Sequence, residues 1–252
     1  MRPNAVKNMI AERRPVLNAW LSIASSHVAE GIAHQGVDSV TIDLQHGAID
    51  FAAAFHMLQA ISTSPAVPFA RVPAHDAAIM GKLLDAGAYG LICPMVENRT
   101  QAEAFVTACR YPPRGTRSFG PNRVTYYAGR DYWQHADAEI LLLAQVETRT
   151  AIDNLDSILA VPGLDGIYIG PADLSLSYGA APAMVPKDTT IEAAIKTACE
   201  SARRADLVAA IHTDGPATAR QRFAEGFHLC SFPTDMRFLL DAVRAAVKEA
   251  RA

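Results

Sequence analysis

The chain lacks several features that mark particular classes of protein. No stretch of its 252 residues approaches the roughly 20 consecutive apolar residues that a membrane-spanning helix needs. Its first residues contain no apolar run of signal-peptide length. A net charge of −3 leaves no basic excess. We therefore expect neither nucleic acid nor a membrane among its partners.

Cysteine is sparse and scattered. The chain has four cysteines, and no two of them form a Cys-x-x-Cys pair. This spacing argues against a zinc cluster and against a disulfide framework. We expect the four to be buried thiols of a cytoplasmic protein. They are Cys93, Cys109, Cys199 and Cys230.

Lysine is also scarce, and this bears on mechanism. None of the five lysines follows a predicted strand, whereas a Schiff-base enzyme needs a desolvated lysine beside its substrate. No Gly-x-Ser-x-Gly motif and no plausible nucleophilic cysteine appear, which weakens acyl-enzyme chemistry. Activation of a carbonyl group by a metal ion is the remaining expectation. The lysines are Lys7, Lys82, Lys187, Lys196 and Lys248.

Strand-like and helix-like stretches alternate along the chain, with short connections. Eight such units in about 250 residues predict a single-domain (β/α)8 TIM barrel of the α/β class over residues 1–252. An open doubly wound sheet is the alternative, but no Gly-x-Gly-x-x-Gly motif follows the first strand. Predicted strands are 15–23, 39–45, 67–72, 90–96, 140–147, 166–169, 207–212 and 228–232; predicted helices are 27–35, 51–62, 76–86, 100–110, 150–159, 190–204, 217–225 and 236–250.

Two stretches depart from this regular alternation. Residues 172–186 are predicted to be mostly loop. Residues 114–138 are rich in Gly, Pro, Arg and Tyr and are too long for an idle connection. Their aromatic side chains indicate an ordered lid or a subunit contact.

Two carboxylates follow neighbouring predicted strands. Asp173 comes after an apolar strand that ends in Gly170 and Pro171, and Glu147 ends the preceding strand. The carboxyl ends of parallel strands are where ligands bind, so these side chains can converge. Two carboxylates suit a hard divalent cation such as Mg²⁺ or Mn²⁺, and zinc is less favoured. The alternative is a helix cap at Asp173 and a solvated pair.

An arginine and a histidine also follow predicted strands. Arg71 has a planar fork that suits a carboxylate or phosphate, although a structural ion pair is the alternative. His46 is a candidate general base because its pKa lies near neutral pH. Either Asp43 or Asp85 could orient its imidazole. Asp85 has the simpler alternative of a polar residue in the last turn of its helix.

In this order, the motifs at the strand ends resemble the HpcH/HpaI aldolase family, the metal-dependent pyruvate aldolases that act on 4-hydroxy-2-oxo acids. The resemblance runs nearly from end to end. It rests on Asp-Leu-Gln-His-Gly at 43–47, Arg-Val-Pro at 71–73, Leu-Leu-Asp-Ala-Gly at 83–87, Pro-Met-Val at 94–96, Tyr-Pro-Pro-Arg-Gly-Thr-Arg at 111–117, Gln-Val-Glu-Thr at 145–148 and Ile-Gly-Pro-Ala-Asp-Leu-Ser at 169–175.

The resemblance implies a role for each matched residue. Glu147 and Asp173 would bind the metal, which is Mg²⁺ or Mn²⁺ with Co²⁺ or Zn²⁺ as further possibilities. Arg71 would stabilise the enolate, and His46 would be the base, made more basic by Asp85. The pyruvate unit would be held by Gln145, Gly170 and Ala172. The family also implies a homo-oligomer, a hexamer built as a dimer of trimers with helix exchange.

Two departures from the family pattern affect what is expected. Many members carry Glu before the motif histidine, where this chain has Gln45. With Gln at this position the chain resembles the hydroxypyruvate/pyruvate aldolase subgroup. This resemblance implies that the enzyme uses a broad range of 2-oxo acids as the aldol donor. The run Ser-Phe-Pro-Thr-Asp at 231–235 replaces small residues and could narrow the mouth of the site.

The expected function is therefore reversible cleavage of a 4-hydroxy-2-oxo acid to pyruvate or hydroxypyruvate and an aldehyde. One alternative is another metal-enolate lyase of the phosphoenolpyruvate/isocitrate-lyase or citrate-lyase β type. The other alternative is a non-catalytic barrel that binds a small acid.

Overall fold

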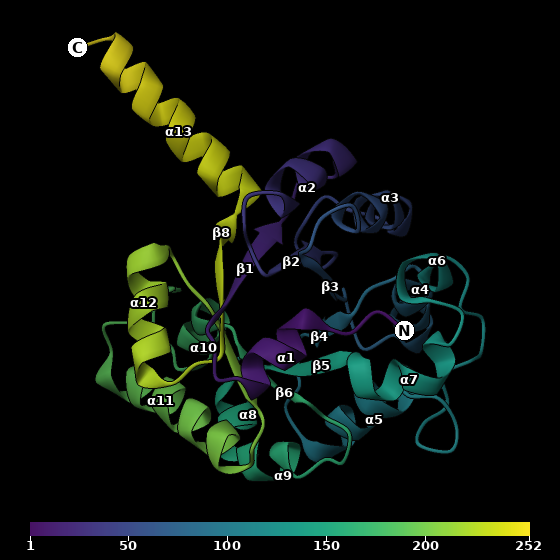
Figure 1. The fold of residues 1–252 in the computed structure, drawn as a ribbon. Coiled ribbons are helices and arrows are strands. Elements are labelled where there is room, and N and C mark those ends of the chain that lie inside the picture. The colour runs from purple at the N-terminus through teal and green to yellow at the C-terminus, as the bar shows by residue number, and fades with distance from the viewer.

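A computed structural model describes all residues from 1 to 252. Its eight parallel strands pair in chain order and close between β8 and β1, which confirms the predicted barrel (Figure 1). The strands are β1 Val16–Leu21, β2 Ser39–Asp43, β3 Val67–Arg71, β4 Gly90–Cys93, β5 Leu141–Val146, β6 Gly166–Ile169, β7 Val208–His212 and β8 Leu229–Thr234.

Helices surround the strands, and none is long and apolar enough to cross a membrane. They are α1 Ala5–Ala11, α2 Ser26–Ala33, α3 Phe51–Ile61, α4 Ala77–Asp85, α5 Arg99–Cys109, α6 Val124–Ala128, α7 Tyr132–Glu139, α8 Arg149–Asp153, α9 Leu155–Leu159, α10 Pro171–Ser177, α11 Thr189–Arg204, α12 Pro216–Glu225 and α13 Asp235–Ala250.

Side chains on alternate strand positions fill the barrel. Phe69 of β3 and Gly90 of β4 are register partners, and a Cβ atom at Gly90 would lie 2.5 Å from the Phe69 ring. Glycine at this position therefore makes room for a large ring inside the barrel. The outward positions pack against the helices, and all four cysteines are buried and free, as expected.

The prediction for residues 172–186 was wrong in part. Residues 172–177 belong to α10, a helix that starts at Pro171. The fixed φ of proline suits the first turn of a helix. The predicted helix 150–159 is divided into α8 and α9 at Asn154, whose φ and ψ of −98° and 8° are not helical. Helix α1 was not predicted.

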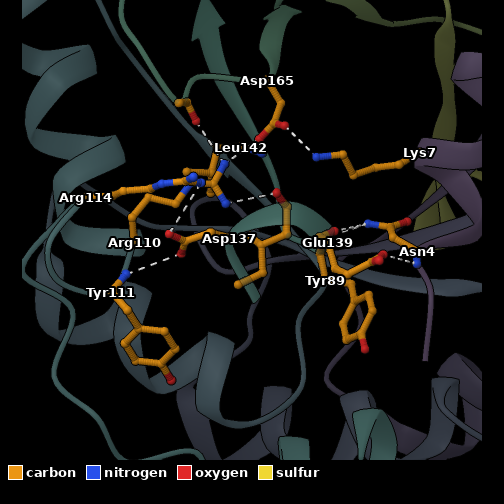
Figure 2. A network of polar contacts seen from close by, with 12 residues as sticks. Asn4, Lys7, Tyr89, Arg110, Tyr111, Arg114, Asp137, Glu139, Leu142 and Asp165 are labelled. Carbon is orange, nitrogen blue, oxygen red and sulfur yellow. Dashed lines mark hydrogen bonds and ion pairs between the residues drawn. The ribbon is translucent and has the colours of Figure 1, made fainter. Parts of the chain in front are cut away.

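The amino ends of three strands are connected by a polar network (Figure 2). Asp165, just before β6, accepts hydrogen bonds from Lys7 Nζ and Arg110 Nη2 at 2.8 and 2.7 Å, and from the amide of Leu142 at 2.8 Å. Asn4 donates from Nδ2 to the carbonyls of Tyr89 and Glu139. These bonds fix the N-terminal segment across the end of the barrel where the strands begin.

The segment 114–138 is ordered, as predicted, but it does not cover the mouth of the barrel. It lies between the end of α5 and the start of β5, at the amino end of the strands, and it contains α6 and α7 (Figure 1). Arg117 within it is buried and donates to Asp85 Oδ1 at 2.7 Å and to the Tyr132 hydroxyl at 2.9 Å. The lid expectation is therefore wrong for a single chain.

Helix α13 leaves the barrel instead of packing on it (Figure 1). Of its residues, only Asp235 is buried. Asp235 Oδ1 accepts from the amide and the hydroxyl of Ser22, both at 2.8 Å, and Oδ2 accepts from the amide of Ile23. These contacts fix the start of the helix to the loop after β1, while its apolar side chains stay exposed. They are Met236, Phe238, Leu239, Leu240, Val243 and Val247.

Removing the Asp165 carboxylate tests the network at the amino end. We expect Asp165→Ala to lower the free energy of unfolding by about 2 to 4 kcal/mol, because it leaves the buried Arg110 guanidinium without its charged partner. Thermal unfolding should show a decrease of several degrees. Glu103→Ala, which breaks the exposed ion pair with Arg99, should change stability by less than about 0.5 kcal/mol. Equal effects of the two variants would contradict this account.

Candidate active site

A buried ion pair between two neighbouring strands forms the centre of the site. Asp43 and Arg71 are register partners at the carboxyl ends of β2 and β3. Arg71 donates from Nε to Asp43 Oδ1 at 2.9 Å and from Nη2 to Oδ2 at 2.6 Å. This two-point contact fixes the plane of the guanidinium group. It leaves Nη1, which has no partner within the chain, to serve a ligand.

Trp20 supports this pair from β1. Its Nε1 donates to Asp43 Oδ2 at 3.1 Å, and the Arg71 guanidinium lies over its ring at 4.9 Å from the centroid. The amides of Gln45 and His46 donate to Asp43 Oδ1. Burial opposes ionisation of Asp43, but the hydrogen bond and charge of Arg71 outweigh it and lower the pKa of the carboxyl.

The second group consists of Glu147 and Gln145 at the end of β5. Glu147 is buried, accepts from the amide of Met95 through Oε1 at 2.9 Å, and accepts from Gln145 Nε2 through Oε2. A Cβ atom at Gly170 would overlap Glu147 Oε2 and would lie 3.1 Å from Gln145 Nε2, so glycine leaves room for both side chains. Burial raises the pKa of Glu147, and the charge of Asp173 raises it further, so this carboxylate lacks a full cationic partner.

Asp173 lies in the first turn of α10 and is exposed to solvent. It does not cap the helix: the N-cap residue is Gly170, which has no side chain to do so. The expectation of a capping aspartate is therefore wrong. Amides of the first helical turn, including that of Ala172, have no partner within the helix and are free to bind an anionic or polar group.

These residues fit a divalent cation. Glu147 and Asp173 provide carboxylate oxygens, and the nearby Gln145 Oε1 is buried without any hydrogen-bond partner. A buried acceptor without a donor indicates a missing positive or polar partner. No group of three or more His, Cys, Asp or Glu side chains surrounds a single point. Two carboxylates and one amide oxygen therefore suit a cation that keeps water or substrate oxygens as its other ligands.

The structure does not bring Asp85 to His46 within one chain. His46 follows β2 at the mouth of the barrel, whereas Asp85 ends α4, a helix that runs back to the amino end of β4. Asp85 pairs there with Arg117, and Asp43 binds the backbone amide of His46, not its imidazole. Neither carboxylate orients the exposed His46 ring in the isolated chain.

Trp20 and Tyr168 also lie at the site, although neither was predicted as a site residue. Trp20 was not considered, although its place two residues after Asn18 on an alternating strand would have put it inside the barrel. Tyr168 and His212 form a hydrogen bond of 2.9 Å at the ends of β6 and β7. Ser231 bonds with Asn18 inside the barrel, and the Phe232 ring packs near that of Phe238 in α13, with centroids 6.4 Å apart.

Breaking the central ion pair should destabilise the protein. We expect Asp43→Asn to cost about 3 to 5 kcal/mol, because Arg71 is left buried without a counter-charge. A folded-state pKa below the ordinary 3.8 means that the stabilisation by Asp43 is present above that pH and is lost only as the pH falls through the lowered value. Denaturant unfolding should therefore show a constant deficit from about pH 5 to pH 8.

The matched control is the double variant Asp43→Asn/Arg71→Met, which removes both charges. It should recover part of the lost stability, because no unpaired charge remains. A double variant that is no more stable than Asp43→Asn would contradict the idea that the unpaired charge of Arg71 causes the loss.

Comparison with known proteins agrees with this geometry. A sequence model of the HpcH/HpaI aldolase/citrate lyase family matches residues 17–242. The chain is 40% identical over 249 residues to a hydroxypyruvate/pyruvate aldolase from Rhizorhabdus wittichii, covering 99% of both proteins. It is 40% identical to a 4-hydroxy-2-oxovalerate aldolase from Novosphingobium aromaticivorans, covering 70% of this chain and 68% of that protein.

Among solved structures, a family protein from Burkholderia cenocepacia superposes with a TM-score of 0.92 at 32% identity, covering 99% of this chain and all of that one. Relatives named as aldolases and matched over nearly the whole chain make this protein an enzyme, a carbon–carbon lyase, and overturn the alternative of a non-catalytic barrel. The chain belongs to the HpcH/HpaI aldolase/citrate lyase family.

Proposed function

We propose that the protein is a divalent-metal-dependent aldolase that reversibly cleaves a 4-hydroxy-2-oxo acid to pyruvate, or hydroxypyruvate, and an aldehyde. The observation that supports this proposal is that a fixed positive charge and a pair of oxygen ligands lie together at the mouth of the barrel. Arg71, fixed by Asp43, presents a positive charge, and Glu147 with Asp173 presents oxygen ligands. The names of the relatives support the same class of substrate.

Glu147 and Asp173 would hold the metal, with Mg²⁺ or Mn²⁺ favoured by their oxygen ligands and Co²⁺ or Zn²⁺ as alternatives. When bound, such an ion acts as a Lewis acid that polarises the 2-keto group and makes the neighbouring C–H bonds more acidic. Gln145 lies beside Glu147, and its buried side chain would position the pyruvate unit. The backbone at Gly170 and Ala172 would bind the carboxylate of that unit.

The protein's own charges would stabilise the enolate. Removal of a proton from the methyl group of pyruvate leaves negative charge on the former keto oxygen. Arg71 is held rigidly by Asp43 and Trp20, so it can stabilise this charge without reorganising. His46 would accept the proton, through a bound water, and return it in the reverse direction.

We also propose that the chain works as a homo-oligomer, a hexamer arranged as a dimer of trimers. The exposed apolar face of α13 supports an exchange of this helix between neighbours, because an isolated helix with such a face is unfavourable in water. An oligomer would also allow Asp85 of one copy to reach His46 of another. Within one chain the two residues lie at opposite ends of the barrel.

Chelation tests the role of the metal. We expect release of pyruvate from racemic 4-hydroxy-2-oxovalerate to stop after EDTA treatment and to return with Mg²⁺, Mn²⁺ or Co²⁺. Glu147→Gln should remain inactive with every metal, because one carboxylate ligand is lost. Added Mn²⁺ should raise the melting temperature of the wild type but not that of this variant. Activity that resists EDTA but is trapped by borohydride would contradict the proposal.

Substitution of Arg71 tests the stabilisation of the enolate. Arg71→Lys keeps the charge but cannot make the two-point contact with Asp43. We expect kcat to fall by about 10²- to 10³-fold, the typical effect of losing one preorganised donor. The control is Arg99→Lys on the exposed face of α5, which should leave kcat unchanged. Wild-type kcat in Arg71→Lys would exclude this role.

Mixed oligomers test whether a site is completed by a second copy. His46→Ala and Asp85→Asn should each be inactive alone. Co-expression should restore part of the activity if Asp85 acts on His46 of a neighbour, because some sites then receive both intact residues. Pairing within one chain would restore none. Sedimentation of the mixture should show the wild-type assembly, and a monomer that is fully active would contradict the oligomer.

A further inference from the structure

The interior of the barrel contains a series of polar side chains that leads from Asn18 of β1 toward the mouth. It begins at Asn18, whose Oδ1 accepts from the hydroxyls of Ser39 and Thr41 at 2.9 and 3.0 Å. An amide oxygen can only accept, so both hydroxyl hydrogens are committed to it. Asn18 Nδ2 then donates to Ser231 Oγ at 2.8 Å.

From Ser231 the series continues to the mouth of the barrel. Ser231 is a neighbour of the Tyr168 hydroxyl and acts to lower the pKa of the phenol. Burial outweighs that effect and raises the pKa of Tyr168 well above its ordinary value, so the phenol keeps its proton. The protonated Tyr168 hydroxyl lies 2.9 Å from His212 Nδ1 and can donate its hydrogen to that nitrogen.

A hydrogen bond donated by Tyr168 would fix the tautomer of His212. If Nδ1 accepts, the hydrogen of the neutral ring is on Nε2. Nε2 has no hydrogen-bond partner in the chain, and His212 is partly exposed at the carboxyl end of β7. Burial and the charge of Arg71 lower the pKa of His212 to about 4, against a smaller opposing effect of Asp43. The ring is therefore neutral at physiological pH.

His212 lies beside the proposed site. Its ring is perpendicular to that of Trp20, with centroids 4.9 Å apart, and the Arg71 guanidinium lies over the same indole at 4.9 Å. Two donors of different character therefore contact the Trp20 ring. Arg71 carries a full charge suited to an enolate, whereas the neutral N–H of His212 suits an uncharged carbonyl or hydroxyl oxygen.

We propose that His212 is a substrate-binding residue that donates a hydrogen bond from Nε2 to the aldehyde oxygen, which is the 4-hydroxyl oxygen in the direction of cleavage. This inference rests on the proposed aldolase function. Tyr168 is a positioning residue that selects the donating tautomer through Nδ1. The pyruvate half of the substrate lies with Glu147 and Arg71 and does not need this contact.

The test compares three substitutions with aldehyde and pyruvate varied separately. His212→Phe keeps a ring but removes the donor, and we expect kcat/KM for acetaldehyde to fall by about 10- to 100-fold while KM for pyruvate stays within twofold. His212→Gln restores an N–H donor and should recover much of the loss. Tyr168→Phe should produce a smaller loss with the same selectivity for the aldehyde. Thermal unfolding checks that each variant is folded.

Exchange of the pyruvate methyl hydrogens in D₂O with Mn²⁺ is the internal reference, since it requires enolate formation but no aldehyde. His212→Phe should exchange at the wild-type rate. The role of His212 would be overturned if His212→Phe kept the wild-type kcat/KM for acetaldehyde. It would also be overturned if His212→Phe lost exchange of the pyruvate methyl hydrogens. A wild type that neither exchanges nor cleaves would instead contradict the proposed function, and this inference with it. The double variant Tyr168→Phe/His212→Phe, which leaves no unpaired phenol, should match His212→Phe.

Discussion

The two-point ion pair between Asp43 and Arg71 is the interaction on which the rest of the site depends. It joins β2 and β3 at their carboxyl ends, and it commits the two guanidinium nitrogens that face Asp43. Asp43 also accepts from the Trp20 indole and from the amide of His46. One carboxylate therefore positions a cation, an aromatic wall and the loop that carries a candidate base.

The interior of this barrel differs from the apolar layers that usually fill the fold. Hydroxyl and amide groups at Asn18, Ser39, Thr41 and Ser231 occupy the layer beneath the mouth. Each has a partner, so the cost of burying it is largely offset. These hydrogen bonds fix the orientation of the Asn18 amide, which an apolar core could not do.

Much of the fold could be predicted from the sequence because strand and helix periodicity are local properties. The eight strands were located by their apolar runs, and Asp43 and Arg71 were located by their positions at strand ends. Their pairing depends on the register of β2 against β3, which no local pattern specifies. For the same reason, Asp85 was expected near His46, although α4 carries it to the opposite end of the barrel.

The least predictable parts are those whose surroundings come from distant segments. Residues 114–138 had the composition of a lid, but Arg117 is held by Asp85 and Tyr132 at the closed end of the barrel. Trp20 and Tyr168 lie within predicted strands, but their contacts with each other and with His212 depend on how β1, β6 and β7 converge, which no local pattern predicts.

Helix α13 has a further consequence. Asp235 at its start binds Ser22 and Ile23, in the loop that follows β1, and β1 carries Trp20 against Arg71. Whatever covers the apolar face of α13 is therefore mechanically connected to the wall of the mouth through two residues. In the proposed oligomer, association and the position of the Trp20 side chain would therefore be linked, and dilution, which favours separate chains, would also release this wall of the mouth.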